Sequence, residues 1–154
     1  MAVREGRAAP PFTLPDAKGQ DVALASFAGK DVIVFFYPAD DTPGCTKEAC
    51  GFRDVWKDFK RAGAVVLGVS PDSGASHVKF ASKYKLPYTL LSDPDRVVMK
   101  KYGAWGEKVL YGKKVIGVIR STVWIGPDGE VKRHWARVPN AATHPDAVIA
   151  ALRG

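Results

Sequence analysis

The sequence is poor in cysteine, with only Cys45 and Cys50 among 154 residues. Two cysteines are too few for the disulfide framework of a small secreted protein, and a chain of this length can bury enough apolar surface to fold as one domain, residues 1–154, without one. The sequence also lacks an apolar run long enough to cross a membrane, and its first residues lack the apolar core of a secretion signal. We therefore expect a cytoplasmic protein without a membrane partner, in which the cysteine pair is catalytic, redox-sensing or metal-binding.

Long basic runs and ligand clusters are absent as well. The formal net charge is +7, but the basic residues are scattered as singles and pairs without interleaved aromatic residues, which indicates solvated surface and no nucleic-acid partner. The three histidines, His77, His134 and His144, lie far apart in the sequence. Cys45 and Cys50 do not have the closer spacing of zinc-binding thiols. The sequence therefore predicts no metal site.

Apolar runs and turn residues predict an α/β fold. Strands are expected at 12–14, 22–24, 32–37, 64–70, 88–91, 122–125 and 131–135, and helices at 43–62, 73–84, 94–102 and 144–152. The first two strands form a hairpin, and the last two form another across the turn at 126–129. Strands alternate with helices early and a hairpin follows late, which is typical of a three-layer sandwich with a mixed sheet. The Gly- and Lys-rich segment 103–117 is expected to be a loop.

The chain after the strand at 32–37 carries the most informative pattern. Thr42 can cap the helix that follows, and Pro43 suits its first position. Cys45 is then the third helical residue, where free backbone N–H groups and the helix dipole favour the thiolate, which is the nucleophilic form. Apolar residues follow it at helical spacing: Ala49, Phe52, Trp56 and Phe59. Cys45 is therefore expected to face the core at the carboxyl end of the sheet, where α/β proteins bind ligands.

Cys50 is expected on the polar face of the same helix. Ideal geometry separates its Cα from that of Cys45 by roughly 8–9 Å. A disulfide tolerates less than about 7 Å, so the two thiols can bond only if the first helical turns unwind. Gly44 and Gly51 would lower the cost of unwinding by about 1 kcal/mol each.

This segment resembles the active site of a known family. The run Pro38-x-x-x-Thr42-x-x-Cys45, with a second cysteine five residues on, is similar to the motif of peroxiredoxins of the bacterioferritin-comigratory (Q-type) subfamily. Further matches are FTLPD near the start, GVSPD at 68–72, SDPD at 92–95, KYGAWGEK at 101–108 and VIRST at 118–122. The resemblance covers nearly the whole chain, is loose after Trp135, and implies a thioredoxin-like fold.

The resemblance also implies a role for each site residue. Cys45 would attack a peroxide and become a sulfenic acid. Thr42 would hydrogen-bond the thiolate or the peroxide, and Arg120 would stabilise the thiolate and the charge that develops on the peroxide oxygens. Pro38 would shield the nucleophile from water. Cys50 would resolve the sulfenic acid by forming an intramolecular disulfide.

The implied activity is that of an atypical two-cysteine peroxidase. It would reduce hydrogen peroxide and organic hydroperoxides without metal, haem or flavin, as a monomer, with thioredoxin or a similar dithiol as reductant. A peroxide-responsive redox sensor and a thiol–disulfide oxidoreductase are the alternatives, although the latter usually has a CxxC spacing. Glu48 is interpreted as a carboxylate on the helix surface or as a residue that orients the active-site loop. Asp40 and Asp41 are expected to face solvent or to pair with nearby bases.

Overall fold

The apolar run at 32–37 forms the centre of a five-stranded mixed sheet in the structure, a computed structural model that describes residues 3–154. The strand order is β5-β4-β3-β8-β9. Strand β3 pairs parallel with β4 and antiparallel with β8. The strands are β3 (Asp31–Phe36), β4 (Ala64–Ser70), β5 (Thr89–Ser92), β8 (Ser121–Ile125) and β9 (Val131–Trp135). A mixed sheet of this order confirms the expected α/β fold.

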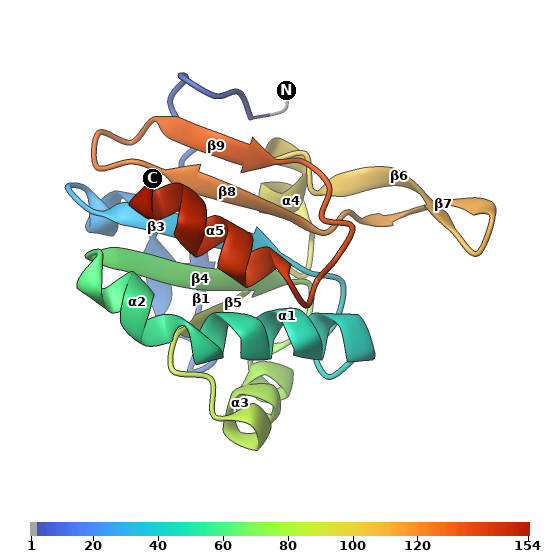
Figure 1. Ribbon diagram of the computed structural model, residues 1–154. Coiled ribbons are helices and arrows are strands. Elements are labelled where there is room, and N and C mark those ends of the chain that lie inside the picture. Colours follow the sequence, from blue (N-terminus) through green and yellow to red (C-terminus); the bar gives the residue numbers. More distant parts are fainter. Residues whose placement is uncertain (1–2) are drawn as a thin grey trace.

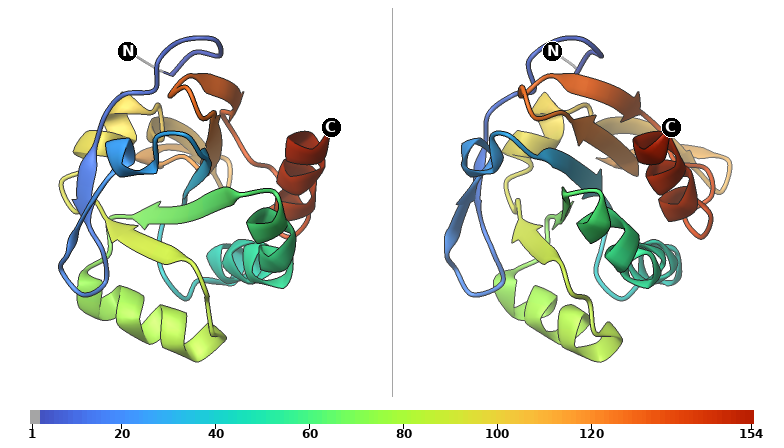
Figure 2. Two further views of the ribbon diagram at one scale, coloured as in Figure 1. Left: turned by 90° about the vertical axis from the view of Figure 1, so that its left-hand side faces the viewer. Right: turned by 60° about the vertical axis from the view of Figure 1, so that its left-hand side comes forward.

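Helices cover both faces of the sheet, so the side chains that β3 directs to either face are buried. Ile33 and Phe35 belong to an apolar cluster with the first group of helices, and Val34 and Phe36 belong to a cluster on the other face. The first group contains α1 (Pro43–Asp54), α2 (Trp56–Arg61), α3 (Gly74–Tyr84) and α5 (His144–Arg153). The other face carries α4 (Val97–Lys101) and the hairpin of β1 (Thr13–Pro15) and β2 (Asp21–Ala23), which a 3-10 turn, η1 (Leu24–Phe27), follows. Figure 2 shows this hairpin and α1 on opposite sides of the sheet.

Two of the expected helices differ from those in the structure. The single helix predicted at 43–62 is wrong, because Val55 leaves the α-helical region, with φ −107° and ψ 14°, and separates α1 from α2. The break lets α1 pack against α5 while α2 packs against β4. The helix expected at 94–102 begins later, at Val97, because Arg96 adopts a left-handed conformation with φ 61°.

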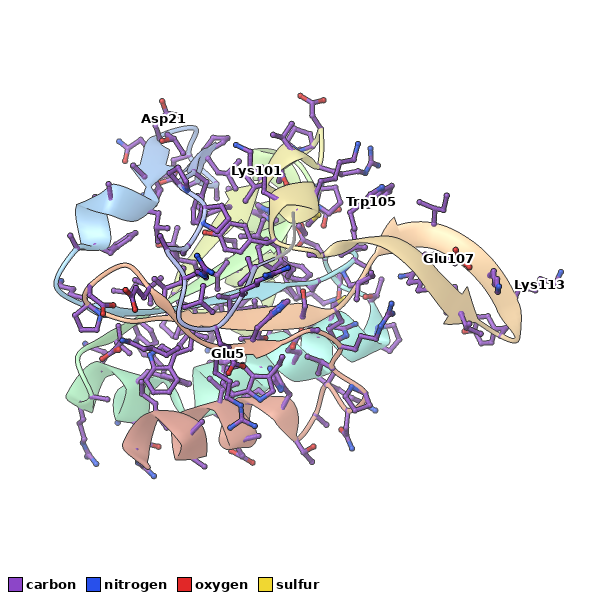
Figure 3. The ribbon with its side chains drawn as sticks, turned by 90° about the horizontal axis from the view of Figure 1, so that it is seen from above. Glu5, Asp21, Lys101, Trp105, Glu107 and Lys113 are labelled. Carbon is purple, nitrogen blue, oxygen red and sulfur yellow. The ribbon has the colours of Figure 1, made fainter. Side chains whose placement is uncertain are left out.

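The loop expected at 103–117 is also wrong. This segment forms a long antiparallel hairpin of β6 (Trp105–Leu110) and β7 (Lys113–Val118), which extends away from the body of the protein (Figures 1 and 3). Its turn residues, Tyr111 and Gly112, have φ values of 53° and 77°, the positive pair that a tight hairpin turn requires. Among residues 3–154, no helix is both long enough and apolar enough to span a membrane.

Candidate active site

Cys45 lies where the sequence predicts, on the buried side of α1 in its first turn. Its side chain is part of the apolar cluster between α1 and the sheet and is only 1% exposed. The short loop that joins β3 to α1 starts at the carboxyl end of the central strand, so the first turn of α1, which contains Cys45, follows that end closely. The thiol therefore sits at a helix N-terminus in surroundings from which most water is excluded.

Arg120 meets Cys45 although 75 residues separate them in sequence. It directly precedes β8, whose first residue pairs with the end of β3, so the sheet brings the guanidinium to the start of α1. Its Nη2 donates to Cys45 Sγ at 3.2 Å, and its Nη1 donates to Glu48 Oε1 at 2.8 Å. Burial acts to lower the pKa of Arg120, but the negative charges of Glu48 and Cys45 outweigh it and raise that pKa. The arrangement places the fixed positive charge of Arg120 next to the sulfur of Cys45.

Glu48 is fully buried, so the expectation of a carboxylate on the helix surface is wrong. The reason is its ion pair with Arg120, which satisfies Oε1, while Oε2 is buried with no hydrogen-bond partner among the described residues. Burial raises the pKa of Glu48 to about 7, more than the attraction of Arg120 lowers it. The buried carboxylate of Glu48 therefore holds the guanidinium of Arg120 at the first turns of α1.

Thr42 stands at the N-cap position, but its side chain does not cap the helix. Its Oγ1 instead donates to the carbonyl of Ala39 at 3.0 Å within the loop before α1, so the expected capping bond is wrong. Pro38, from the same loop, and Arg120 share an open hollow of about 260 Å³. The hollow is also lined by Lys108, Leu110, Val118, Ile119, Arg137 and Val138. A small substrate can reach the Arg120 side of the site through it.

Lys108 is a site residue that the sequence reasoning missed. It lies on β6, within the segment expected to be a loop, and its Nζ donates to the carbonyl of Val118 at 2.6 Å. Burial and the nearby charge of Arg120 lower the pKa of Lys108, while the charge of Cys45 acts in the opposite direction. Gly112 is compatible with a hairpin turn at 111–112, but nothing in the local sequence indicates that Lys108 lies near Arg120.

Cys50 is half-buried on α1, and both cysteines are free thiols. Burial raises the pKa of the Cys50 thiol, and Arg53 offsets this only in part. The two helix glycines also have packing roles. A Cβ on Gly44 would lie 3.2 Å from Arg120 Nη2, and one on Gly51 would lie 2.7 Å from Pro145 Cγ of α5.

The two loop aspartates have different surroundings. Asp41 is exposed and pairs with Lys83 at 2.8 Å, as expected of a residue that faces solvent or a base. Asp40 is buried against His77, so of the two expected arrangements, facing solvent or pairing with a base, it adopts the second.

The comparisons with known proteins agree with this geometry. The AhpC/TSA family matches residues 6–134. Peroxiredoxin bcp of Coxiella burnetii is 50% identical over 138 residues, which cover 90% of this chain and 91% of that protein. A solved structure of the Xanthomonas campestris bacterioferritin comigratory protein, studied for its alkyl peroxide reduction activity, is 39% identical with a TM-score of 0.86. The match covers 92% of this chain and 90% of that protein. The structure of a cysteine-to-serine variant of Xylella fastidiosa PrxQ is 30% identical with a TM-score of 0.91. The match covers 99% of this chain and 97% of that protein.

Proposed function

Since the chain belongs to the AhpC/TSA family of thiol-dependent peroxidases, we propose that it reduces hydroperoxides with Cys45 as the nucleophile. The observation that carries the proposal is the 3.2 Å contact between Arg120 Nη2 and Cys45 Sγ at the start of α1. A guanidinium and a helix N-terminus acting on one sulfur stabilise its thiolate. They also stabilise the negative charge that develops on the departing peroxide oxygen when that sulfur attacks.

In the first step, the Cys45 thiolate attacks the nearer oxygen of the peroxide. A sulfur–oxygen bond forms and the O–O bond breaks, so that Cys45 becomes a sulfenic acid and the peroxide leaves as water or an alcohol after taking up one proton. Arg120 faces the reacting sulfur, and Pro38 limits the access of water from the loop side. The hydroxyl of Thr42 donates to the carbonyl of Ala39, so its oxygen remains free to accept a hydrogen bond from the peroxide.

In the second step, Cys50 resolves the sulfenic acid. Its thiol sulfur attacks the sulfur of Cys45, a disulfide forms within the chain, and water leaves. The helical geometry of α1 keeps the two Cα atoms roughly 8–9 Å apart, beyond the reach of a disulfide. The first turns of α1 must therefore unwind during each turnover. Because the resolving thiol lies in the same chain, the reaction needs no second subunit, and we expect the enzyme to act as a monomer.

In the third step, an external dithiol reduces the disulfide and returns both thiols. We propose thioredoxin or a similar dithiol protein of the cytoplasm for this role. Lys108, Arg120 and Arg137 line the hollow, so this side of the protein is basic and suits an acidic donor. If charge steers this encounter, turnover with thioredoxin falls as ionic strength rises, and equal rates at low and high salt would remove the argument.

The test of the proposed function is the consumption of hydrogen peroxide and an organic hydroperoxide with thioredoxin, its reductase and NADPH. We expect many turnovers for the wild type and none for Cys45→Ser. Cys50→Ser should lose turnover with thioredoxin but still reduce one equivalent of peroxide. A single turnover by the wild type would favour the redox sensor, and reduction of protein disulfides without peroxide turnover would favour the oxidoreductase.

A further inference from the structure

The loop that leads from β3 into α1 contains a buried contact between a carboxylate and a histidine that the peroxidase steps do not use. Asp40, in the middle of this loop, turns its side chain inward until it is 4% exposed. Its partner is His77 of α3, which is 0% exposed, and the distance from His77 Nδ1 to Asp40 Oδ2 is 2.8 Å. A carboxylate removed from water in this way persists only when hydrogen bonds satisfy it.

The Asp40 carboxylate is satisfied by three side chains. Its Oδ1 accepts from Tyr37 Oη at 2.6 Å, and its Oδ2 accepts from Ser76 Oγ at 2.7 Å and faces His77. Burial alone would raise the pKa of Asp40, but these hydrogen bonds outweigh it and lower that pKa, so the carboxylate is ionised. Its backbone N–H also donates to Asp72 Oδ2 at 2.8 Å. The middle of the loop is thus held from the end of β3, from the turn after β4 and from α3.

Both ring nitrogens of His77 face acceptors. Nε2 lies 2.9 Å from the carbonyl oxygen of Leu91 in β5, which can only accept a hydrogen bond. Nδ1 faces an ionised carboxylate that already accepts from Tyr37 and Ser76. His77 is therefore fixed between β5 and the active-site loop, with a contact at each ring nitrogen.

A second carboxylate attaches the same loop to α3. Asp41 adopts φ 58°, a left-handed conformation that is unfavourable for a residue with a side chain. Its carboxylate accepts from Lys83 Nζ at 2.8 Å and from Tyr84 Oη at 2.7 Å, both near the end of α3. The loop is therefore held by contacts near both ends of α3, which packs beside β5 (Figure 2).

We propose that His77 is a positioning residue for the peroxide reaction: its ring holds Asp40, and through it the loop carrying Pro38 and Thr42, in the conformation in which Cys45 reacts. The contacts fix the chain up to Asp41, so the unwinding that resolution needs is confined to Thr42 and the first turns of α1. Loss of the His77 contact removes one of the three side chains that hold the Asp40 carboxylate and loosens the loop that carries Pro38 and Thr42. The proposal rests on the proposed function of Cys45.

Two substitutions of His77 distinguish the loss of the contact to Asp40 from the effect of replacing a buried side chain. The amide nitrogen of an asparagine replaces Nδ1, so His77→Asn can still donate to Asp40, while that of a glutamine replaces Nε2, so His77→Gln donates to Leu91 instead. A hydrogen bond to a charged group contributes enough that we expect His77→Gln to slow the reaction of Cys45 with hydrogen peroxide by about tenfold or more. His77→Asn should retain most of the wild-type rate. The rate is measured in a Cys50→Ser background by competition with a second peroxidase for limiting peroxide.

The disulfide step gives the second readout. In proteins with both cysteines, formation of the disulfide after peroxide addition is followed by quenched intact mass. We expect it to be as fast in His77→Gln as in the wild type, or faster, because the loop is released. Equal rates of the peroxide step in the two His77 variants, both shown to be folded by circular dichroism, would overturn the proposal. A wild type that does not react with peroxide would instead overturn the proposed function.

Discussion

Replacing Glu48 with glutamine is the perturbation whose energy can be worked out most directly from the structure. Glutamine has nearly the same shape as glutamate, and its side-chain oxygen can still accept from Arg120 Nη1, as Glu48 Oε1 does at 2.8 Å. It carries no charge at any pH, however. The substitution therefore removes the ionisation of Glu48 while retaining the packing around the start of α1.

The pKa of Glu48 sets both the size and the sign of the effect. Folding moves it from the ordinary value of 4.5 to about 7. Between these values the folded protein retains a proton that the unfolded chain has lost, so the free energy of unfolding falls as pH rises. At about 1.4 kcal/mol for each pH unit of difference, ionised Glu48 costs the folded state about 3 kcal/mol above pH 7. Below pH 4.5 the cost disappears.

Urea unfolding of the reduced wild type and of Glu48→Gln, followed by circular dichroism from pH 4 to pH 8, measures this difference. We expect the stability of the variant relative to the wild type to increase by about 3 kcal/mol across this range, with most of the change between pH 4.5 and 7. Other titrating groups are common to both proteins and cancel. A stability difference that does not change with pH would refute the reasoning, because it would mean that Glu48 has the same pKa in the folded and unfolded states.

Three further predictions concern Arg120, Gly44 and His144. Arg120→Lys replaces a guanidinium that contacts Cys45 and Glu48 together, and we expect the rate constant for peroxide reaction, measured by competition, to fall by about 100-fold. Gly44→Ala should slow the same reaction by about tenfold without loss of stability in urea, because its Cβ would lie 3.2 Å from the guanidinium while alanine favours the helix; an unchanged rate would contradict this. Burial and nearby arginines lower the pKa of His144 to about 4 from 6.5, so the unfolded chain binds more protons between these values and the wild type loses stability as pH falls through them. His144→Gln should reduce this acid-dependent loss by about 3 kcal/mol between pH 6.5 and 4, and parallel curves for the two proteins would contradict it.

The sequence predicted best those elements whose residues are buried on both sides or bounded by clear turns. Strands β4 and β9 have the predicted bounds, because the first is a continuous apolar run and the second follows a hairpin turn. The hairpin of β6 and β7 escaped prediction because it extends from the body, so no buried face imposes an alternation on its lysine-rich strands. Prediction from the spacing of apolar residues depends on the burial of one face, and this segment buries few side chains.

In the candidate site, the local part was predictable and the long-range part was not. The place of Cys45 at the buried start of α1 follows from Thr42, Pro43 and the apolar stripe. The burial of Glu48 could not be predicted, because the cation that compensates it lies 72 residues away. Arg120 itself was expected only through the family resemblance, since nothing in its local sequence distinguishes it from other basic residues.

The central claim is that Cys45 attacks peroxide and Cys50 resolves it within the chain. The intact mass of the reduced protein, quenched within seconds of adding one equivalent of hydrogen peroxide, tests both parts. We predict the loss of two hydrogens in the wild type, and the gain of one oxygen in Cys50→Ser. A wild type that gains one oxygen would contradict the role of Cys50, and an unchanged mass would contradict the peroxidase assignment itself.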